Sequence, residues 1–171
     1  MNEERMERAN MTYEFKNIST DNYELHYNAK DGSQKVIPFT RSISMATKLQ
    51  GITAQARLKM FKELTAQGMT KDDLVVKHDM GNGKVTYDES NYQAFEMEYV
   101  REQSAIAIDE IIKECFKMDL MSLFSDMGVD VYSTDQKTAK EVEIFTQKFS
   151  TIIAGKDNQT PSVGDKQQLS E

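Results

Sequence analysis

The stretch richest in potentially chemical residues is "HDMGNGKVTYDES" at residues 78–90, which combines His, Asp, Asn, two glycines and an acidic end. A calcium-binding EF-hand loop requires oxygen ligands at positions 1, 3, 5 and 12 and glycine at position 6. With Asp79 at position 1, positions 3, 5 and 6 fall on Gly81, Gly83 and Lys84, and none of them matches. A Walker phosphate loop fails as well, because Gly-x-Gly-Lys is too short and no hydroxyl residue follows the lysine. The stretch therefore predicts neither a calcium site nor a phosphate site.

A β-hairpin explains the same residues better. Asn82 and Gly83 suit the two central positions of a type I′ turn, where both residues take positive φ. The register that follows pairs Met80 with Val85, Asp79 with Thr86, His78 with Tyr87 and Lys77 with Asp88.

The remaining nucleophile and metal-ligand candidates are few. Cys115 lies among Ile111, Ile112 and Phe116, which is typical of a small core residue, although a reactive thiol beside a histidine stays open. Both histidines, His26 and His78, fall in predicted strands, and two histidines with one cysteine do not make a zinc site by spacing.

Carboxylates gather on one long predicted helix. Acidic residues of helix bundles bind metals together with Glu-x-x-His motifs, and no histidine follows position 78. We interpret these carboxylates as a solvated helix face, and we expect no catalytic residue, no metal and no cofactor. They are Glu96, Glu98, Glu102, Asp109, Glu110 and Glu114.

Three strands open the predicted architecture. Residues 12–18 and 23–29 alternate apolar and polar side chains, and "QKVIPF" follows a tight turn at Asp31-Gly32. Pro38 lacks a backbone donor and indicates an edge strand or a strand end. These segments predict an antiparallel meander.

Helices follow the meander. A short helix at 42–51 has Ser42 as N-cap, and a second at 53–68 has Thr53 as cap and an apolar stripe of Ala54, Leu58, Phe61 and Leu64 or Thr65. The first is too short for a DNA-reading helix-turn-helix, which we therefore disfavour. The strongest helix covers 91–117, and its continuity through 101–107 stays open. A shorter one ends near Gly128, and another opens on a Ser133–Gln136 capping box and closes at Gly155.

The predicted fold is therefore α+β: an N-terminal meander and a hairpin packed with a helical C-terminal half. We expect a flexible N-terminus at 1–10, one domain at 11–155 and a disordered tail at 156–171. The single cysteine, together with the lack of a signal peptide and of a membrane-length apolar run, predicts a cytoplasmic protein.

Charge is distributed unevenly along the chain. The net charge is −7, which makes nucleic acid an improbable partner, yet no acidic residue occurs between Gly32 and Lys62. Such a basic segment can attract an acidic partner or pair the two halves of the fold. Candidate partner-binding residues are the basic Arg41, Lys48, Arg57, Lys59 and Lys62, and, in a methionine-rich segment, Met118, Met121, Phe124 and Met127.

Three features together resemble small accessory proteins of tailed-phage and prophage morphogenesis, most closely the tail assembly chaperones of Gram-positive siphophages. They are the run "ARLKMFKELTAQGMTKDDLVVK", the "GNGKVTYDES" hairpin and the long acidic helix. The resemblance implies a non-catalytic protein that binds a tail-tube or tail-length protein during assembly.

Two other functional classes stay open. One is a regulator or inhibitor that docks onto a host or phage protein through its acidic helical surface. The other is an enzyme that uses Cys115. The oligomeric state does not follow from the sequence.

Overall fold

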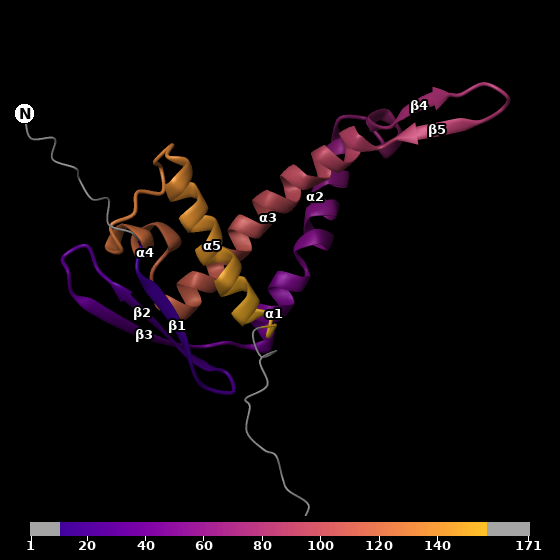
Figure 1. Cartoon of the computed structure of the whole chain (residues 1–171). Coiled ribbons are helices and arrows are strands. Elements are labelled where there is room, and N and C mark those ends of the chain that lie inside the picture. The colour runs from indigo at the N-terminus through magenta and orange to yellow at the C-terminus, as the bar shows by residue number, and fades with distance from the viewer. Residues whose placement is uncertain (1–10, 157–171) are drawn as a thin grey trace, which may run out of the picture.

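The computed structural model describes residues 11–156 and confirms the α+β class. The predicted N-terminal segment 1–10 and all but the first residue of the predicted tail 156–171 lie outside the described residues. Figure 1 shows the elements in their spatial arrangement. They are β1 (Tyr13–Ser19), β2 (Asn22–Asn28), β3 (Gln34–Thr40), α1 (Ile43–Gln50), α2 (Ile52–Ala66), the 3-10 helix η1 (Lys71–Leu74), β4 (Val76–Asp79), β5 (Val85–Asp88), α3 (Ser90–Phe116), α4 (Leu120–Asp126) and α5 (Gln136–Ile153).

The first three strands form the predicted antiparallel meander in the order β1-β2-β3. Alternate residues of β2 point into the core, and Leu25 lies opposite Phe15 of β1 and Ile37 of β3. The β2–β3 turn uses Gly32 at φ +85°, as the Asp31-Gly32 pair predicts. Pro38 lies in β3, which is an edge strand of this sheet.

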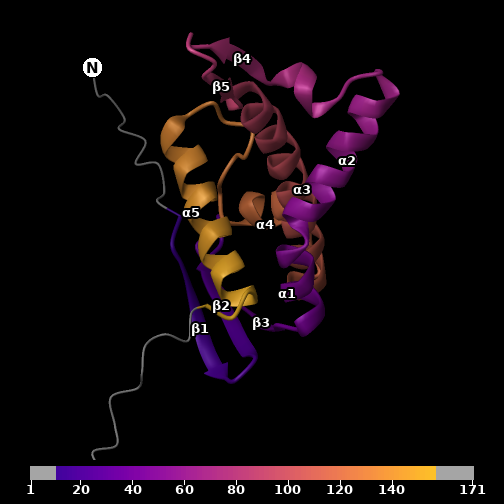
Figure 2. The ribbon, with the colours of Figure 1, turned by 90° about the vertical axis from the view of Figure 1, so that its right-hand side faces the viewer.

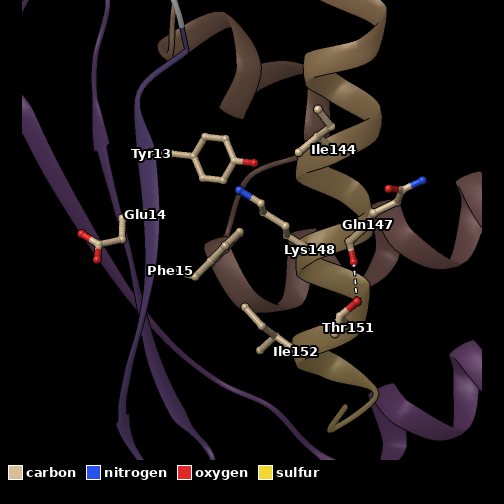
Figure 3. A pocket seen from close by; sticks show the side chains of 8 residues that line it. All are labelled: Tyr13, Glu14, Phe15, Ile144, Gln147, Lys148, Thr151 and Ile152. Carbon is tan, nitrogen blue, oxygen red and sulfur yellow. Dashed lines mark hydrogen bonds between the residues drawn. The ribbon is translucent and has the colours of Figure 1, made fainter. Parts of the chain in front are cut away.

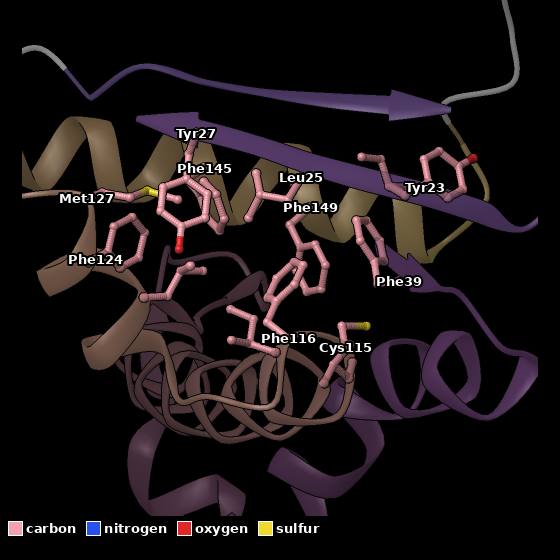
Figure 4. Close-up of a cluster of buried hydrophobic side chains, with 14 of the residues drawn as sticks. Tyr23, Leu25, Tyr27, Phe39, Cys115, Phe116, Phe124, Met127, Phe145 and Phe149 are labelled. Carbon is pink, nitrogen blue, oxygen red and sulfur yellow. The ribbon is translucent and has the colours of Figure 1, made fainter. Parts of the chain in front are cut away.

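Helices cover one face of the sheet, and the main core lies between the two layers (Figures 2 and 4). Phe145 and Phe149 of α5 are fully buried there. The Phe149 ring lies 5.3 Å from that of Phe116 at the end of α3, and Phe145 lies 5.0 Å from Phe124 of α4. Aromatic pairs at these separations add to the stabilisation that burial of their surface provides.

The helix ends confirm some predicted caps and correct others. Ser42 caps α1 as predicted, because its hydroxyl accepts a hydrogen bond from the Met45 backbone N–H (3.2 Å). Thr53 is not a cap, since α2 follows α1 directly after Gly51 and Thr53 is already in its first turn. The predicted Ser133–Gln136 capping box is also wrong. Asp135 is the N-cap of α5, and the Ser133 hydroxyl instead accepts from the Asp135 backbone N–H (3.2 Å).

Residues 52–106, which we call the arm, project from the rest of the described chain, which we call the body (Figure 1). The arm consists of α2 packed against the first part of α3, with η1 and the β4–β5 hairpin at its far end. It has its own small apolar cluster of buried residues: Ala56, Met60, Leu64, Tyr92 and Tyr99.

α3 joins the arm to the body as one uninterrupted helix of 27 residues. At 1.5 Å per residue it is about 40 Å long. Its first half contributes Tyr92 and Tyr99 to the arm cluster, and its second half contributes Ile111, Ile112 and Phe116 to the main core. No helix among residues 11–156 combines the length and the apolar character that a membrane crossing requires.

The buried side of α2 differs from the predicted stripe. Ala56, Met60 and Leu64 face α3, whereas Leu58 and Phe61 are 50% and 43% exposed. The reason is electrostatic as well as apolar, because Arg57 and Lys59 pair with carboxylates of α3 and so orient α2. Only Leu64 is common to the predicted stripe and the buried one.

The β4–β5 hairpin forms where it was predicted, but its predicted register is wrong by one residue. Val76 pairs with Asp88, Lys77 with Tyr87, His78 with Thr86 and Asp79 with Val85. The cause is the turn: Gly81 takes a positive φ together with Asn82 and Gly83, so three residues form the loop instead of two. The Met80 backbone N–H accordingly donates to the Lys84 carbonyl (2.9 Å).

Candidate protein-binding site

Cys115 lies in the main core rather than in a reactive setting. Its side chain is buried, its Sγ lies 3.7 Å from Sδ of Met45, and burial raises the pKa of the thiol to about 12. Because the thiolate is the nucleophile, a raised pKa suppresses the reactive form at neutral pH. Within residues 11–156, no group of three or more His, Cys, Asp and Glu side chains is placed to hold a metal ion.

Most of the predicted basic contact residues are engaged within the chain. Lys48 pairs with Glu110 (3.2 Å), Lys59 with Glu102 (2.7 Å), and Arg57 with Glu96. These pairs join α1 and α2 to the acidic face of α3. The basic segment therefore pairs two parts of the fold, which was one of the two roles that its charge predicted.

Arg41 and Lys62 differ in their surroundings. The Arg41 guanidinium contacts Asp21 (3.0 Å), donates to the Ile152 carbonyl (3.0 Å) and lies over the Tyr23 ring, so it ties β3 to α5. Lys62 is exposed on α2 and has no ion-pair partner among the described residues. Of the five basic candidates, Lys62 is the one whose charge is most available to another molecule.

The methionine-rich segment contributes mainly to the core. Phe124 and Met127 are buried, which corrects their assignment as surface contacts; Met118 is half-buried, and Met121 is 43% exposed. The Asp126 carboxylate explains the burial, because it accepts hydrogen bonds from the Tyr27 hydroxyl (2.5 Å) and the Lys35 ammonium (2.8 Å). These bonds hold α4 against the sheet.

Exposed apolar side chains concentrate on the arm instead. Eight of the fourteen large apolar side chains that are exposed among residues 11–156 belong to it, although the body is the larger part. The eight are Leu58, Phe61, Val76, Met80, Val85, Tyr87, Met97 and Ile106. Contiguous exposed apolar surface of this kind marks interaction sites in folded proteins.

One part of this surface is the outer stripe of α2, formed by Ala54, Leu58, Phe61 and Thr65. These positions recur every three or four residues, so they share one side of the helix. All four are exposed, and the buried stripe that faces α3 is on another side. α2 is therefore apolar on two sides, and only one of them is covered within the described chain.

The hairpin at the end of the arm forms the second part. All eight residues of β4 and β5 are exposed, and so is Met80 in the loop region between them. Val76 and Met80 lie on one face, and Val85 and Tyr87 on the other. An isolated two-stranded hairpin is marginally stable in water, so cover on either face would stabilise it.

A groove of about 850 Å³ lies at the base of the arm, between α1, α2 and α3. Ile43 and Ile106, which are 87% and 47% exposed, line it together with Gln55. The Lys48–Glu110 ion pair also belongs to its lining. The groove continues the exposed apolar surface of the arm onto the body.

Comparisons of the chain with protein-family models, with curated proteins and with solved structures found no match. The arrangement of the residues themselves therefore carries the functional argument.

Sequence reasoning missed the arm as a binding surface, although one signal was present. Ala56, Met60 and Leu64 recur every four residues beside the stripe that was predicted to be buried. Two apolar stripes on one helix indicate two covered sides. The exposure of the hairpin had no comparable signal, since its alternation is also that of a half-buried strand pair.

Proposed function

We propose that this chain is a non-catalytic binding protein and that its arm docks onto an apolar surface of another protein. The observation that carries the proposal is the concentration of exposed apolar side chains on the arm, above all the outer stripe of α2 and the two faces of the hairpin. The buried, high-pKa setting of Cys115 supports a binding role over a thiol-based one.

The energetics of apolar burial fit this role. Covering a Leu or Phe side chain contributes about 1.5–3 kcal/mol relative to leaving it in water. A few such residues at the centre of an interface supply most of the affinity of a typical complex. Leu58 and Phe61 are spaced to act together as one anchor, and Lys62 beside them offers a charge to an acidic rim.

We propose further that the partner is a tail-tube or tail-length protein of a phage or prophage, bound during tail assembly in the cytoplasm. The resemblance to tail assembly chaperones supports this, because its residues 56–77 and 81–90 and the long helix together make up the arm. Docking as an inhibitor through the acidic helix has less support, since Glu96, Glu102 and Glu110 already pair within the chain.

Native affinity capture with mass spectrometry tests the proposal. The tagged wild-type chain is compared with a Leu58→Ser, Phe61→Ser double variant of the outer stripe. Loss of two interface anchors is expected to weaken partner capture at least about tenfold. A tail protein among the captured partners would support the more specific assignment, and its absence from all captured complexes in a phage-producing cell would contradict it.

Tyr132→Ser is the matched control, because Tyr132 is 77% exposed but lies on the body. It is expected to leave partner capture unchanged. If the control loses the partner while the outer-stripe variant retains it, the arm is not the binding element.

A further inference from the structure

The outer edge of β1 is open in the described chain. β1 pairs with β2 on one side, and no strand among residues 11–156 pairs with its other side. The Asn28 backbone N–H donates to the Thr12 carbonyl (3.1 Å), which shows that this residue of the chain directs its carbonyl toward β2. Because these groups alternate in direction along a strand, Glu14 and Lys16 direct theirs toward β2, and Tyr13, Phe15 and Asn17 direct theirs outward.

Two opposite charges stand along this edge. The Glu14 and Lys16 side chains are two residues apart, so they lie on the same face of the sheet. Their side chains are 66% and 47% exposed, and they contact each other only weakly, at 3.7 Å. Each is therefore accessible to a charge on an added strand.

We propose that β1 pairs with β1 of a second copy of this chain, antiparallel, about a two-fold axis at Phe15. In this register the outward N–H and C=O groups of Tyr13, Phe15 and Asn17 meet those of Asn17, Phe15 and Tyr13 of the second copy. Glu14 then faces Lys16 of the second copy, and Lys16 faces Glu14. The symmetry makes every contact occur twice, as an isologous interface requires.

Charge selects this register from its neighbours. Moving the axis by one residue in either direction keeps the hydrogen-bonding groups matched, but it places Glu14 opposite Glu14 or Lys16 opposite Lys16. Like charges that face each other directly across two strands are destabilising, whereas opposite charges are stabilising. β1 is thus self-complementary about Phe15 and about neither adjacent residue.

A groove beside the same edge would be covered by the second copy. It measures about 570 Å³ and lies between β1 and α5, where Tyr13 and Phe15 face Ile144, Lys148 and Ile152 (Figure 3). Ile144 is 37% exposed, and the buried Tyr13 hydroxyl has no hydrogen-bond partner among the described residues. A strand added to β1 lies along this groove, so strand pairing and cover of the apolar side of α5 occur together.

The dimer joins two three-stranded sheets into one and leaves both arms outside the interface. Two arms in one particle increase the avidity for a partner that repeats its binding site. The pairing of β1 does not depend on the proposed function of the arm, because none of its residues belongs to residues 52–106.

Sedimentation of the full chain over a wide range of concentrations tests the proposal. The wild type is expected to show a monomer–dimer equilibrium. Glu14→Lys and Lys16→Glu each place like charges opposite one another at both symmetric positions, so each is expected to raise the dimer Kd about tenfold or more. The double variant, Glu14→Lys with Lys16→Glu, restores opposite charges at both positions and is expected to restore the wild-type Kd.

Asn17→Pro is an independent test of the strand pairing. The Asn17 N–H points away from β2, so proline there removes a donor from the open edge and none from the β1–β2 ladder. We expect this variant to be monomeric, with a circular dichroism spectrum like that of the wild type.

Three outcomes would overturn the proposal. They are a wild-type mass that stays monomeric at every concentration, a dimer whose Kd neither single charge variant changes, and a double variant that dimerises as weakly as the single variants.

Discussion

Asp126 is the residue whose charge most directly connects the helical layer to the sheet. Its carboxylate accepts hydrogen bonds from the Lys35 ammonium and the Tyr27 hydroxyl, and these lower its pKa. The same bonds raise the pKa of Tyr27, after the larger effect of burial. The ionised carboxylate is therefore the form that the folded state prefers, and its contribution to stability depends on pH.

The sign of that dependence follows from the lowered pKa. A carboxylate whose folded pKa is below its unfolded value, near 4, stabilises the fold above that value, and the stabilisation is lost as the pH falls through the folded pKa. We expect Asp126→Asn to lower stability at neutral pH and to flatten the loss of stability below about pH 4. Urea denaturation at several pH values measures this. Parallel pH curves for the two proteins would show that Asp126 does not have this role.

At the scale of elements, α2 is held by a small cluster that is separate from the main core. Met60 is fully buried against α3, and Met45 of α1 is equally enclosed in the body. Truncating either side chain to alanine removes a buried thioether and leaves a cavity, at a cost of about 2–5 kcal/mol. The two changes nevertheless affect different parts of the molecule.

We expect Met60→Ala to speed hydrogen exchange in α2 and in the first half of α3 while the amides of β2 stay protected. Met45→Ala is the matched control and is expected to reduce protection in the sheet and α5. Hydrogen exchange with mass spectrometry separates the two segments. Equal loss of protection in arm and sheet after Met60→Ala would mean that the arm does not open separately.

The same elements show what the sequence could predict. The meander, the long helix and α5 were predictable because their apolar periodicity continues over many residues and is covered by one main core. The buried side of α2 was not, because Leu58 and Phe61 make a plausible core stripe and only the ion pairs to α3 identify the other side. The hairpin register depended on whether Gly81 joins the turn, and glycine is compatible with either loop.

Candidate site residues were harder to predict for a related reason. Phe124 and Met127 were taken as a contact surface from their composition, but the bonds of Asp126 across the fold enclose them. Lys48, Arg57 and Lys59 were taken as contacts for a partner, but their carboxylate partners lie on a helix about forty residues or more away in sequence. Exposure and pairing of this kind depend on long-range packing, which residue types alone do not specify.

The whole molecule divides its surface between two roles. The body buries most of its apolar side chains around the sheet, and it leaves one open strand edge at β1. The arm carries most of the exposed apolar surface and projects away from that core (Figure 1). A binding protein with this division holds its partner by the arm and keeps the body free for association with a second copy.

Oxidative footprinting of methionine tests the role of the arm most directly, because the chain carries its own control. Met80 and Met97 of the arm are 67% and 51% exposed, and Met121 of the body is 43% exposed. Exposed methionine is oxidised to the sulfoxide by peroxide, and cover by a partner slows this reaction. In the purified complex with its captured partner, we expect Met80 or Met97 to be protected while Met121 oxidises at the rate of the free chain. Protection of Met121, with Met80 and Met97 oxidised as in the free chain, would contradict a partner-binding arm.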